Sequence, residues 1–280
     1  MIAGSPIQAG VIGRPVAHSL SPLIHGAWIK AAGIDAAYGR FTPKDGQSFA
    51  DEIALLRTLG MKGLNVTLPF KEEALALADS ASPIARASGA ANLLFFKGGR
   101  IEADNTDGIG LLSALAQQAP KLNIAGAPVV LLGAGGAARG ALAALLASGA
   151  PEVRILNRTL ERAETLADLD PRAYALPLNW AGEAFLGAGL VVNATAAGLS
   201  GAAELELPLD ALPEEAVVMD MVYKPLETGL LRAARARGLT GVDGLAMLIG
   251  QAVPSFEAFY GRPPPEGVDV RALCLEALGQ

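Results

Sequence analysis

The stretch that decides the fold is Val129-Val-Leu-Leu-Gly133-Ala134-Gly135-Gly136-Ala137-Ala138. Its four leading apolar residues predict a buried strand of a parallel sheet, and the run from 136 to 148 predicts a helix. Between the two, Gly133 allows a tight turn, Gly135 lets the backbone approach a pyrophosphate, and Ala138 permits close packing of helix on strand. The helix N-terminus then offers unpaired N–H groups to phosphates. This pattern indicates a dinucleotide-binding unit rather than a packing turn alone.

A second strand, 153–157, and a helix, 159–169, complete this unit, and the residues between them predict the cofactor. An NAD site usually has Asp or Glu here, about 20 residues beyond the glycines, to hold the ribose hydroxyls. This chain has Asn157-Arg158-Thr159 instead. The Arg158 guanidinium can pair with a 2′-phosphate and lie against the adenine ring, although an arginine here can also be a plain surface residue. We predict that the chain binds NADP(H) in preference to NAD(H).

The composition fits a chain with large buried sheets. Of 280 residues, 51% are hydrophobic and only 18% are charged, which favours parallel strands covered on both faces. The net charge of −6 argues against nucleic acid or an anionic membrane surface as a partner. Glycines and Arg139 interrupt the most apolar stretch, so we expect no spanning helix.

Cysteine and histidine are too few to predict a disulfide framework or a metal site, since the chain has one cysteine, Cys274, and two histidines. The first ten residues lack the basic and apolar regions of a secretion signal. A cytoplasmic location is therefore expected.

Apolar runs alternate with helical stretches along the chain, which predicts an α/β fold with mostly parallel sheets. We expect a substrate-binding catalytic domain from 1–107 and 246–280 and a Rossmann-type NADP-binding domain from 108–245, with a cleft between them. Residues 199–215 are rich in Pro and Glu and predict a loop. The other expected strands are 7–13, 63–68, 190–195, 217–222 and 239–242, and the other expected helices are 47–59, 71–78, 108–118, 226–237, 245–260 and 271–278.

Two hydroxyl groups lie where the first helix is expected to begin. Ser21 is predicted to cap this helix, with Pro22 as its first residue and Gly33 as its stop signal. Because a helix N-terminus attracts anions, Ser19 and Ser21 also favour a bound carboxylate. A capping role alone would account for Ser21 equally well.

A second polar cluster lies at the end of the expected strand 63–68. Asn65 and Thr67 are two residues apart, so their side chains point to the same face. Lys71 follows at a helix start, where a solvated lysine is the simpler interpretation when it is taken alone. Polar groups at two further turns, 89–92 and 104–108, add to the indication of a substrate site.

Taken together, these motifs resemble those of the shikimate dehydrogenase family, and they follow the family's order from Gly13 to Gln251. The family's Ser-x-Ser, Asn-Val-Thr-x-Pro-x-Lys and Asn-Thr-Asp-Gly patterns are present at 19–21, 65–71 and 105–108. Further matches are found at 133–137, 157–159, 193–195, 223–225 and 243–251.

The resemblance implies a reversible, NADPH-dependent reduction of 3-dehydroshikimate to shikimate. It makes Lys71 and Asp107 the catalytic pair, with Lys71 as proton donor or acceptor and Asp107 orienting it. Which of the two residues transfers the proton stays open. It also implies that Ser19 and Ser21 bind the substrate carboxylate. The residues expected around the ring hydroxyls are Asn65, Thr67, Lys71, Asn92, Asp107, Tyr223 and Gln251. The residues expected at NADP(H) are Gly133, Ala134, Gly135, Gly136, Ala137, Asn157, Arg158 and Thr159, with Thr195 and Gly244 beside the nicotinamide.

Two alternatives stay open. A quinate or quinate/shikimate dehydrogenase would differ around Ser19 and Ser21, because quinate has an extra hydroxyl on the carbon that bears the carboxylate. A non-catalytic NADP-binding sensor would have no need of Lys71 and Asp107. Both histidines are expected to support the fold, and a homodimer is one candidate assembly that the sequence does not decide.

Overall fold

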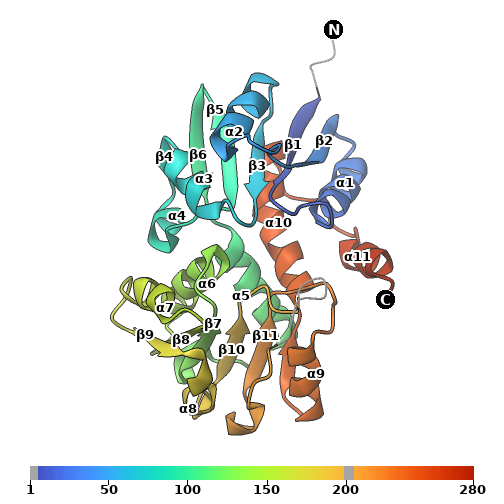
Figure 1. Ribbon diagram of the computed structural model, residues 1–280. Helices are drawn as coiled ribbons and strands as arrows, with labels where there is room; N and C mark the ends of the chain where they lie inside the picture. Colours follow the sequence, from blue (N-terminus) through green and yellow to red (C-terminus); the bar gives the residue numbers. More distant parts are fainter. Residues whose placement is uncertain (1–5, 199–204) are drawn as a thin grey trace. The chain divides into compact units, whose positions relative to one another are not determined.

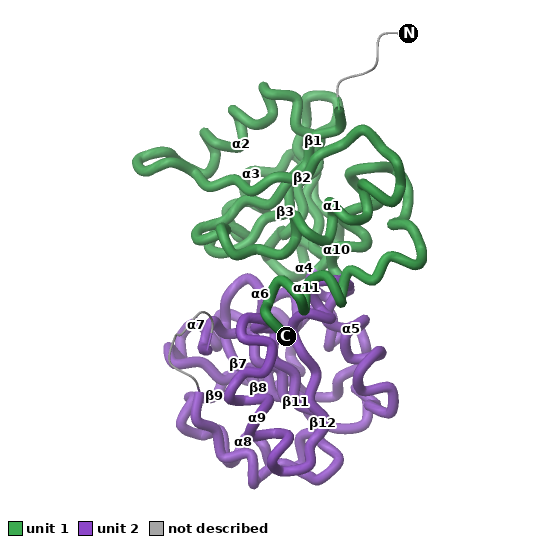
Figure 2. The backbone as a smooth tube through the Cα atoms, turned by 90° about the vertical axis from the view of Figure 1, so that its right-hand side faces the viewer, with its two compact units in different colours: residues 1–106, 251–280 green, residues 107–250 purple. Residues whose placement is uncertain are grey.

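The structure, a computed structural model, describes residues 6–198 and 205–280. The chain divides into two compact units, unit 1 with residues 1–106 and 251–280 and unit 2 with residues 107–250 (Figure 2). Each unit is built around one six-stranded sheet. The sequence places the domain limits at 107/108 and 245/246 instead, and those limits stay a prediction.

Unit 2 contains a parallel sheet with the strand order β12-β11-β10-β7-β8-β9 (Figure 1). β7 comes first in the sequence and lies between β10 and β8, so the strand order reverses there, as in doubly wound dinucleotide-binding folds. Its strands are β7 (Val129–Leu132), β8 (Val153–Asn157), β9 (Ala173–Pro177), β10 (Leu190–Asn193), β11 (Val217–Asp220) and β12 (Thr240–Val242). Its helices are α5 (Asp107–Gln118), α6 (Gly136–Ala147), α7 (Leu160–Ala167), α8 (Ala181–Phe185) and α9 (Gly229–Ala236).

The two faces of this sheet bury alternate residues of the same strands. Val129 and Leu131 pack with residues of α5, α6 and α7, whereas Val130 and Leu132 pack with residues of α8 and α9. All four side chains are fully buried. Because side chains alternate along a strand, a strand covered on both faces has the continuous apolar sequence seen here.

Unit 1 contains a mixed sheet with the strand order β2-β1-β3-β5-β6-β4. β2, β1 and β3 are parallel, whereas β5 runs antiparallel to both β3 and β6. Gly98 and Gly99 join β5 to β6, and both have the positive φ (57° and 78°) that such tight hairpins require. The strands are β1 (Ile7–Ile12), β2 (Ala36–Phe41), β3 (Gly63–Val66), β4 (Ser80–Ala81), β5 (Leu93–Lys97) and β6 (Arg100–Asp104).

The helices of unit 1 are α1 (Ser21–Ala32), α2 (Phe49–Thr58), α3 (Lys71–Leu77), α4 (Pro83–Ser88) and α11 (Val270–Leu278). α11 packs on α1. The long helix α10 (Gly244–Tyr260) belongs to both units, because the change of unit falls between Gly250 and Gln251.

The strands and helices expected from the sequence are present, with ends that differ by a few residues. The expectation that Ser21 caps the first helix is wrong: Leu20 is the N-cap residue, without a side-chain hydrogen bond, and α1 begins at Ser21 itself. The sequence does not predict the short elements β2, β4, β5, β6, β9, α4 and α8.

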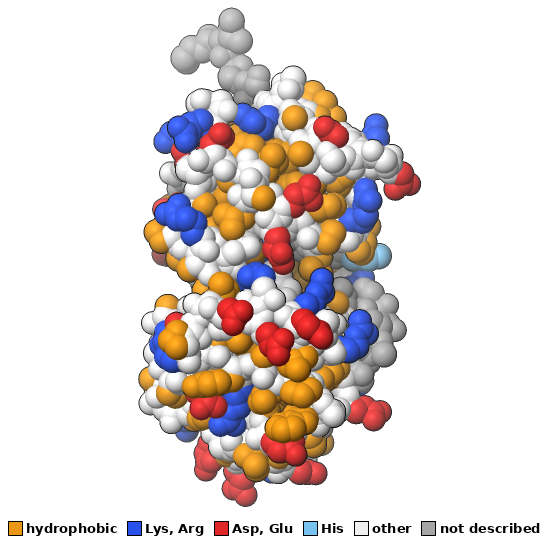
Figure 3. All heavy atoms as spheres, turned by 60° about the vertical axis from the view of Figure 1, so that its left-hand side comes forward, with side chains coloured by type: hydrophobic (Ala, Val, Ile, Leu, Met, Phe, Trp, Pro, Cys, Tyr) orange, Lys and Arg blue, Asp and Glu red, His pale blue; other side chains and the backbone are white. Residues whose placement is uncertain are grey.

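Of the loop predicted at 199–215, residues 199–204 lie outside the described residues. The remainder contains a short 3-10 turn, Leu209–Ala211. No helix in the described parts of the chain is long and apolar enough to cross a membrane. On the face shown in Figure 3, Lys and Arg side chains are interspersed with Asp and Glu side chains.

The thiol of Cys274 is expected to react slowly in the folded chain. Cys274 lies fully buried in α11, and burial raises the pKa of its thiol to about 11. Since only the thiolate is a good nucleophile, 5,5′-dithiobis(2-nitrobenzoate) at pH 8 should titrate the thiol rapidly in denaturant and at least tenfold more slowly in buffer. Equal rates in the two conditions would contradict this placement.

Candidate active site

The polar residues of unit 1 gather at one edge of its sheet. Asn65 in β3 pairs with Leu93 at the start of β5, and Leu93 pairs with Asp104 at the end of β6. Because β5 runs antiparallel to both neighbours, its start lies beside their ends. Asn92, just before β5, and Thr106, just after β6, therefore lie close to Asn65.

A buried network joins Asn92, Thr106 and Gln251. The Thr106 N–H donates to Asn92 Oδ1 (2.8 Å), and Asn92 Nδ2 donates to Thr106 Oγ1 (3.0 Å). The Thr106 hydroxyl donates in turn to Gln251 Oε1 (3.4 Å). These bonds orient two of the predicted substrate-binding residues, because a buried amide keeps the orientation that satisfies its hydrogen bonds. Thr106 itself was missed, although it lies inside the Asn-Thr-Asp-Gly motif.

Asn65 is held by three partners. Its Nδ2 donates to Ser255 Oγ (2.8 Å) and to the Asn92 carbonyl oxygen (3.3 Å), and its Oδ1 accepts from the Tyr38 hydroxyl (2.7 Å). The Ser255 hydroxyl donates to the Gln251 carbonyl oxygen (3.1 Å) within α10. Both amide hydrogens of Asn65 are thus used inside the protein, and Oδ1 alone keeps capacity, as an acceptor for a ligand hydroxyl.

Ser19 and Ser21 lie together at the start of α1. The Ser21 N–H donates to Ser19 Oγ (3.3 Å), and the Ser19 carbonyl oxygen accepts from the Arg40 guanidinium (2.7 Å). Arg40 was not singled out from the sequence. It places a positive charge at the Ser19 backbone, just before α1, which suits an anionic ligand group.

Thr67 and Lys71 follow β3. A Cβ added to Gly13 would lie 2.3 Å from Thr67 Cγ2, so glycine at position 13 lets Thr67 lie against the end of β1. Lys71 is the first residue of α3 and is half-buried. Its carbonyl oxygen accepts from the Ala91 N–H (2.8 Å), which ties the start of α3 to the turn before Asn92.

Asp107 directly follows Thr106 and is the first residue of α5, in unit 2. The chain therefore connects the predicted carboxylate directly to the Asn92–Thr106–Gln251 network. Pairing of Asp107 with Lys71 stays a prediction.

His25 is fully buried in α1 and stacks on Tyr38, with ring centroids 4.0 Å apart and an interplanar angle of 8°. Neither of its ring nitrogens has a hydrogen-bond partner among the described residues. Burial lowers the pKa of His25 from 6.5 to about 3, so the imidazole is neutral near pH 7. This supports the expected structural role and argues against acid–base chemistry.

This pKa predicts a pH dependence of stability. Between pH 6.5 and 3 the unfolded chain binds a proton at His25 that the folded chain does not, so the free energy of unfolding falls as the pH falls through this range. At pH 4.5 the loss relative to pH 8 is about 3 kcal/mol from this residue. Denaturant unfolding of wild type and His25→Gln at both pH values checks it: the variant should lose less stability on acidification, and equal losses would contradict the prediction.

In unit 2, the glycine turn after β7 has the geometry that phosphate binding needs. Gly133 has a φ of 106°, in the left-handed region, and a Cβ on it would lie 3.1 Å from Thr195 Cγ2. Gly135 is the N-cap of α6 and has open space at its Cβ position. Since no side chain caps α6 and Gly136 is its first residue, the first N–H groups of the helix suit a pyrophosphate. Ala134 and Ala137 lie in the same turn and first helical turn.

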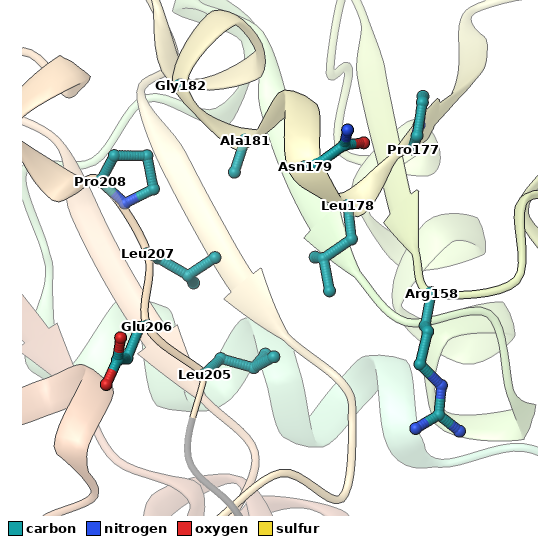
Figure 4. Close-up of a pocket in the computed structure, with 10 residues that line it drawn as sticks. All are labelled: Arg158, Pro177, Leu178, Asn179, Ala181, Gly182, Leu205, Glu206, Leu207 and Pro208. Carbon is teal, nitrogen blue, oxygen red and sulfur yellow. The ribbon is translucent and has the colours of Figure 1, made fainter.

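The end of β8 carries the predicted 2′-phosphate site. Asn157 Nδ2 donates to the Thr159 carbonyl oxygen (2.8 Å), which shapes the turn that presents the exposed Arg158. Arg158 lies at the edge of a pocket of about 500 Å³ whose centre is faced by Leu178 and Leu205 (Figure 4). A guanidinium beside an apolar wall fits a phosphorylated adenosine. The other lining residues are Pro177, Asn179, Ala181, Gly182, Glu206, Leu207 and Pro208.

Thr195, predicted beside the nicotinamide, is held by a chain of bonds at the ends of β10 and β11. Its N–H and hydroxyl both donate to Asn193 Oδ1 (3.1 and 2.7 Å), and Asn193 Nδ2 donates to Asp220 Oδ1 (3.0 Å). The buried Asp220 also accepts from the Thr228 hydroxyl (2.7 Å). Asp220 was missed by the sequence reasoning, and its only signal is an acidic residue ending an apolar strand.

Gly244 and Tyr223 are the remaining predicted residues: Gly244 lies against the segment that follows β11, and Tyr223 is part of that segment. A Cβ on Gly244 would lie 2.4 Å from the Met221 carbonyl oxygen, so only glycine fits where α10 begins. Asp243 caps this helix by accepting from the Ala246 N–H (2.9 Å). Tyr223 is half-buried in the segment after β11.

These features define the class of protein: an NAD(P)-dependent oxidoreductase with a doubly wound nucleotide-binding unit and a separate unit that carries a polar site. Residues 11–94 match the family model for the shikimate dehydrogenase substrate binding domain, and residues 114–201 match the model for shikimate / quinate 5-dehydrogenase. The shikimate dehydrogenase (NADP(+)) of Caulobacter vibrioides (strain NA1000 / CB15N) is 53% identical over 281 residues, covering 100% of this chain and 98% of that protein. The chain belongs to the shikimate dehydrogenase family.

Solved structures agree in fold over nearly the whole chain. Shikimate 5-dehydrogenase from Thermus thermophilus, in complex with NADP(H) and shikimate, is 38% identical with a TM-score of 0.81, covering 92% of this chain and 95% of that one. Quinate dehydrogenase from Corynebacterium glutamicum, in complex with NAD, is 30% identical with a TM-score of 0.87, covering 99% and 100%. The predicted family and α/β fold are thus confirmed, whereas the roles of single residues stay predictions.

Proposed function

We propose that this chain catalyses the reversible, NADP(H)-dependent interconversion of 3-dehydroshikimate and shikimate. The observation that carries the proposal is the edge of the unit 1 sheet, where Asn65, Asn92 and Gln251 are oriented by one buried network next to Lys71. Such fixed amides and hydroxyls suit a small ligand rich in hydroxyl groups. The full-length similarity to curated NADP-dependent shikimate dehydrogenases supports the same assignment.

In this proposal the substrate carboxylate lies at Ser19 and Ser21, near the Arg40 guanidinium. The ring hydroxyls are bound by Asn65, Thr67, Lys71, Asn92, Asp107, Tyr223 and Gln251. Asn65 contributes as an acceptor through Oδ1, because both of its amide hydrogens are already donated to Ser255 and Asn92. Amides locked by protein partners select a fixed pattern of hydroxyl groups, since a wrongly placed hydroxyl would leave them unpaired.

NADP(H), when bound, supplies the hydride chemistry. The turn 133–137 binds its pyrophosphate through backbone N–H groups, and Asn157, Arg158 and Thr159 hold the adenosine end, with Arg158 on the 2′-phosphate. Thr195 and Gly244 border the nicotinamide. The Asn193–Asp220 bond fixes the position of Thr195, so the protein contributes orientation.

Lys71 transfers the proton to and from the C3 oxygen. In the reduction direction its ammonium donates a proton to the oxygen on which negative charge develops, and in the oxidation direction its amine accepts the proton. Asp107 orients Lys71 and accepts a hydrogen bond from the neighbouring substrate hydroxyl. A non-catalytic NADP-binding sensor would have no use for this pair.

A quinate/shikimate dehydrogenase is the second candidate, favoured by the likeness to the Corynebacterium glutamicum quinate dehydrogenase bound to NAD. Arg158 favours NADP and therefore shikimate. Initial rates at 340 nm with shikimate or quinate, each with NADP⁺ or NAD⁺, separate the candidates. Shikimate with NADP⁺ should have the highest kcat/KM, and a higher value for quinate with NAD⁺ would reverse the assignment.

We further propose a cytoplasmic enzyme that acts without nucleic acid or membrane. A homodimer stays a prediction, which light scattering coupled to gel filtration tests through the molar mass in solution.

A further inference from the structure

We propose that Tyr38 is a positioning residue, whose hydroxyl holds the Asn65 amide in the orientation that binds substrate. The proposal rests on the proposed function and adds to it a residue outside the predicted site. The supporting observation is a set of hydrogen bonds that runs from Tyr38 in β2 to Asn65 in β3 and on to Asn92 and Ser255.

The donor-to-acceptor direction of these hydrogen bonds follows from one backbone carbonyl group. The Asn92 carbonyl oxygen can only accept, so the Asn65 atom 3.3 Å from it must be the amide nitrogen. The Asn65 Oδ1 therefore faces Tyr38 and can only accept from the Tyr38 hydroxyl at 2.7 Å. Burial raises the pKa of Tyr38 well above its usual range, so the hydroxyl keeps the proton that this bond needs.

Tyr38 has one proton, and Asn65 takes it. Tyr38 thus fixes the orientation of the Asn65 amide together with Ser255 and the Asn92 carbonyl oxygen. Asn65 is expected to bind a ring hydroxyl of the substrate.

The phenol ring of Tyr38 is itself held by an aromatic cluster. His25 stacks on it at 4.0 Å, and Phe259 lies with its centroid 6.2 Å away. The buried His25 keeps both ring nitrogens without partners among the described residues, so it contributes packing and no polar contact. The cluster therefore holds the ring in place while the Tyr38 hydroxyl donates to Asn65 Oδ1.

Tyr38→Phe removes the hydroxyl and keeps the ring. We expect the KM for shikimate to rise about five- to tenfold, as for the loss of one net hydrogen bond, with kcat and the KM for NADP⁺ changed less than twofold. Tyr260→Phe is the matched control: Tyr260 belongs to the same aromatic cluster, with its centroid 6.4 Å from that of His25, and its hydroxyl donates only a long bond (3.5 Å) to the Ala37 carbonyl oxygen.

An Asn65→Ala background separates positioning from a general structural effect. Once Asn65 is absent, adding Tyr38→Phe should raise KM by less than twofold, because the amide that Tyr38 positions is gone. The proposal is overturned if Tyr38→Phe behaves like Tyr260→Phe, or if its full effect persists in the Asn65→Ala background. If wild type fails to oxidise shikimate at all, the proposed function falls, and this inference falls with it.

Discussion

Replacing Lys71 with alanine lowers kcat for shikimate oxidation by about a hundred- to ten-thousand-fold, the range that a positioned acid–base group contributes. In the proposed mechanism the C3 hydroxyl then lacks its proton acceptor, and the charge that develops on oxygen in the reverse reaction lacks the Lys71 ammonium. The KM for NADP⁺ should change little, because the predicted cofactor residues all lie in unit 2. Stopped-flow or steady-state absorbance at 340 nm gives both values.

Lys97→Ala is the matched control for this variant, since Lys97 is an exposed lysine at the end of β5 in the same unit. It should keep the wild-type kcat. Asp107→Ala should lose both turnover and shikimate binding, because Asp107 is expected to orient Lys71 and to hold a substrate hydroxyl. A Lys71→Ala enzyme with unchanged kcat would exclude Lys71 as the proton-transfer group.

Replacing Arg158 with alanine lowers kcat/KM for NADP⁺ by about 10- to 100-fold and leaves the value for NAD⁺ nearly unchanged. The size follows from the loss of charge-assisted hydrogen bonds to a phosphate dianion, and the selectivity follows because NAD⁺ lacks that phosphate. Arg158 is exposed at the turn after β8, so its loss should leave the fold intact.

Arg162→Ala is the matched control for Arg158, because Arg162 is an exposed arginine in the adjoining helix α7. It should leave both cofactor constants within twofold of wild type. An Arg158→Ala variant that lost activity equally with NADP⁺ and NAD⁺ would show that Arg158 does not recognise the 2′-phosphate.

The nucleotide-binding unit could be predicted from the sequence because its determinants are local. This unit begins with three consecutive elements: the strand at 129–132, the turn at Gly133 and the helix from Gly136. Each can be recognised from its local sequence without knowledge of the rest of the chain. The strand order around β7 then follows the known rules for βαβ units. The substrate residues were found through motif order, which depends on resemblance.

The contacts that orient the substrate residues could not be predicted. Asn65 and Ser255 are 190 residues apart in the chain, and Tyr38 lies in β2, a strand without a clear apolar alternation. The antiparallel direction of β5 brings Asn92 to the same edge of the sheet as Asn65. No local sequence pattern predicts this direction. Ser21 shows the same limit: its position suggests a helix cap, whereas Leu20 is the N-cap residue and α1 begins at Ser21 itself.

The most direct test of the proposed function is the stoichiometry of one reaction. The purified chain is mixed with shikimate and excess NADP⁺, NADPH is followed at 340 nm, and the organic product is identified by mass spectrometry. We predict one NADPH for each 3-dehydroshikimate formed, a product two hydrogen atoms lighter than shikimate. Absence of NADPH formation, or NADPH formation without that product, would contradict the proposed function.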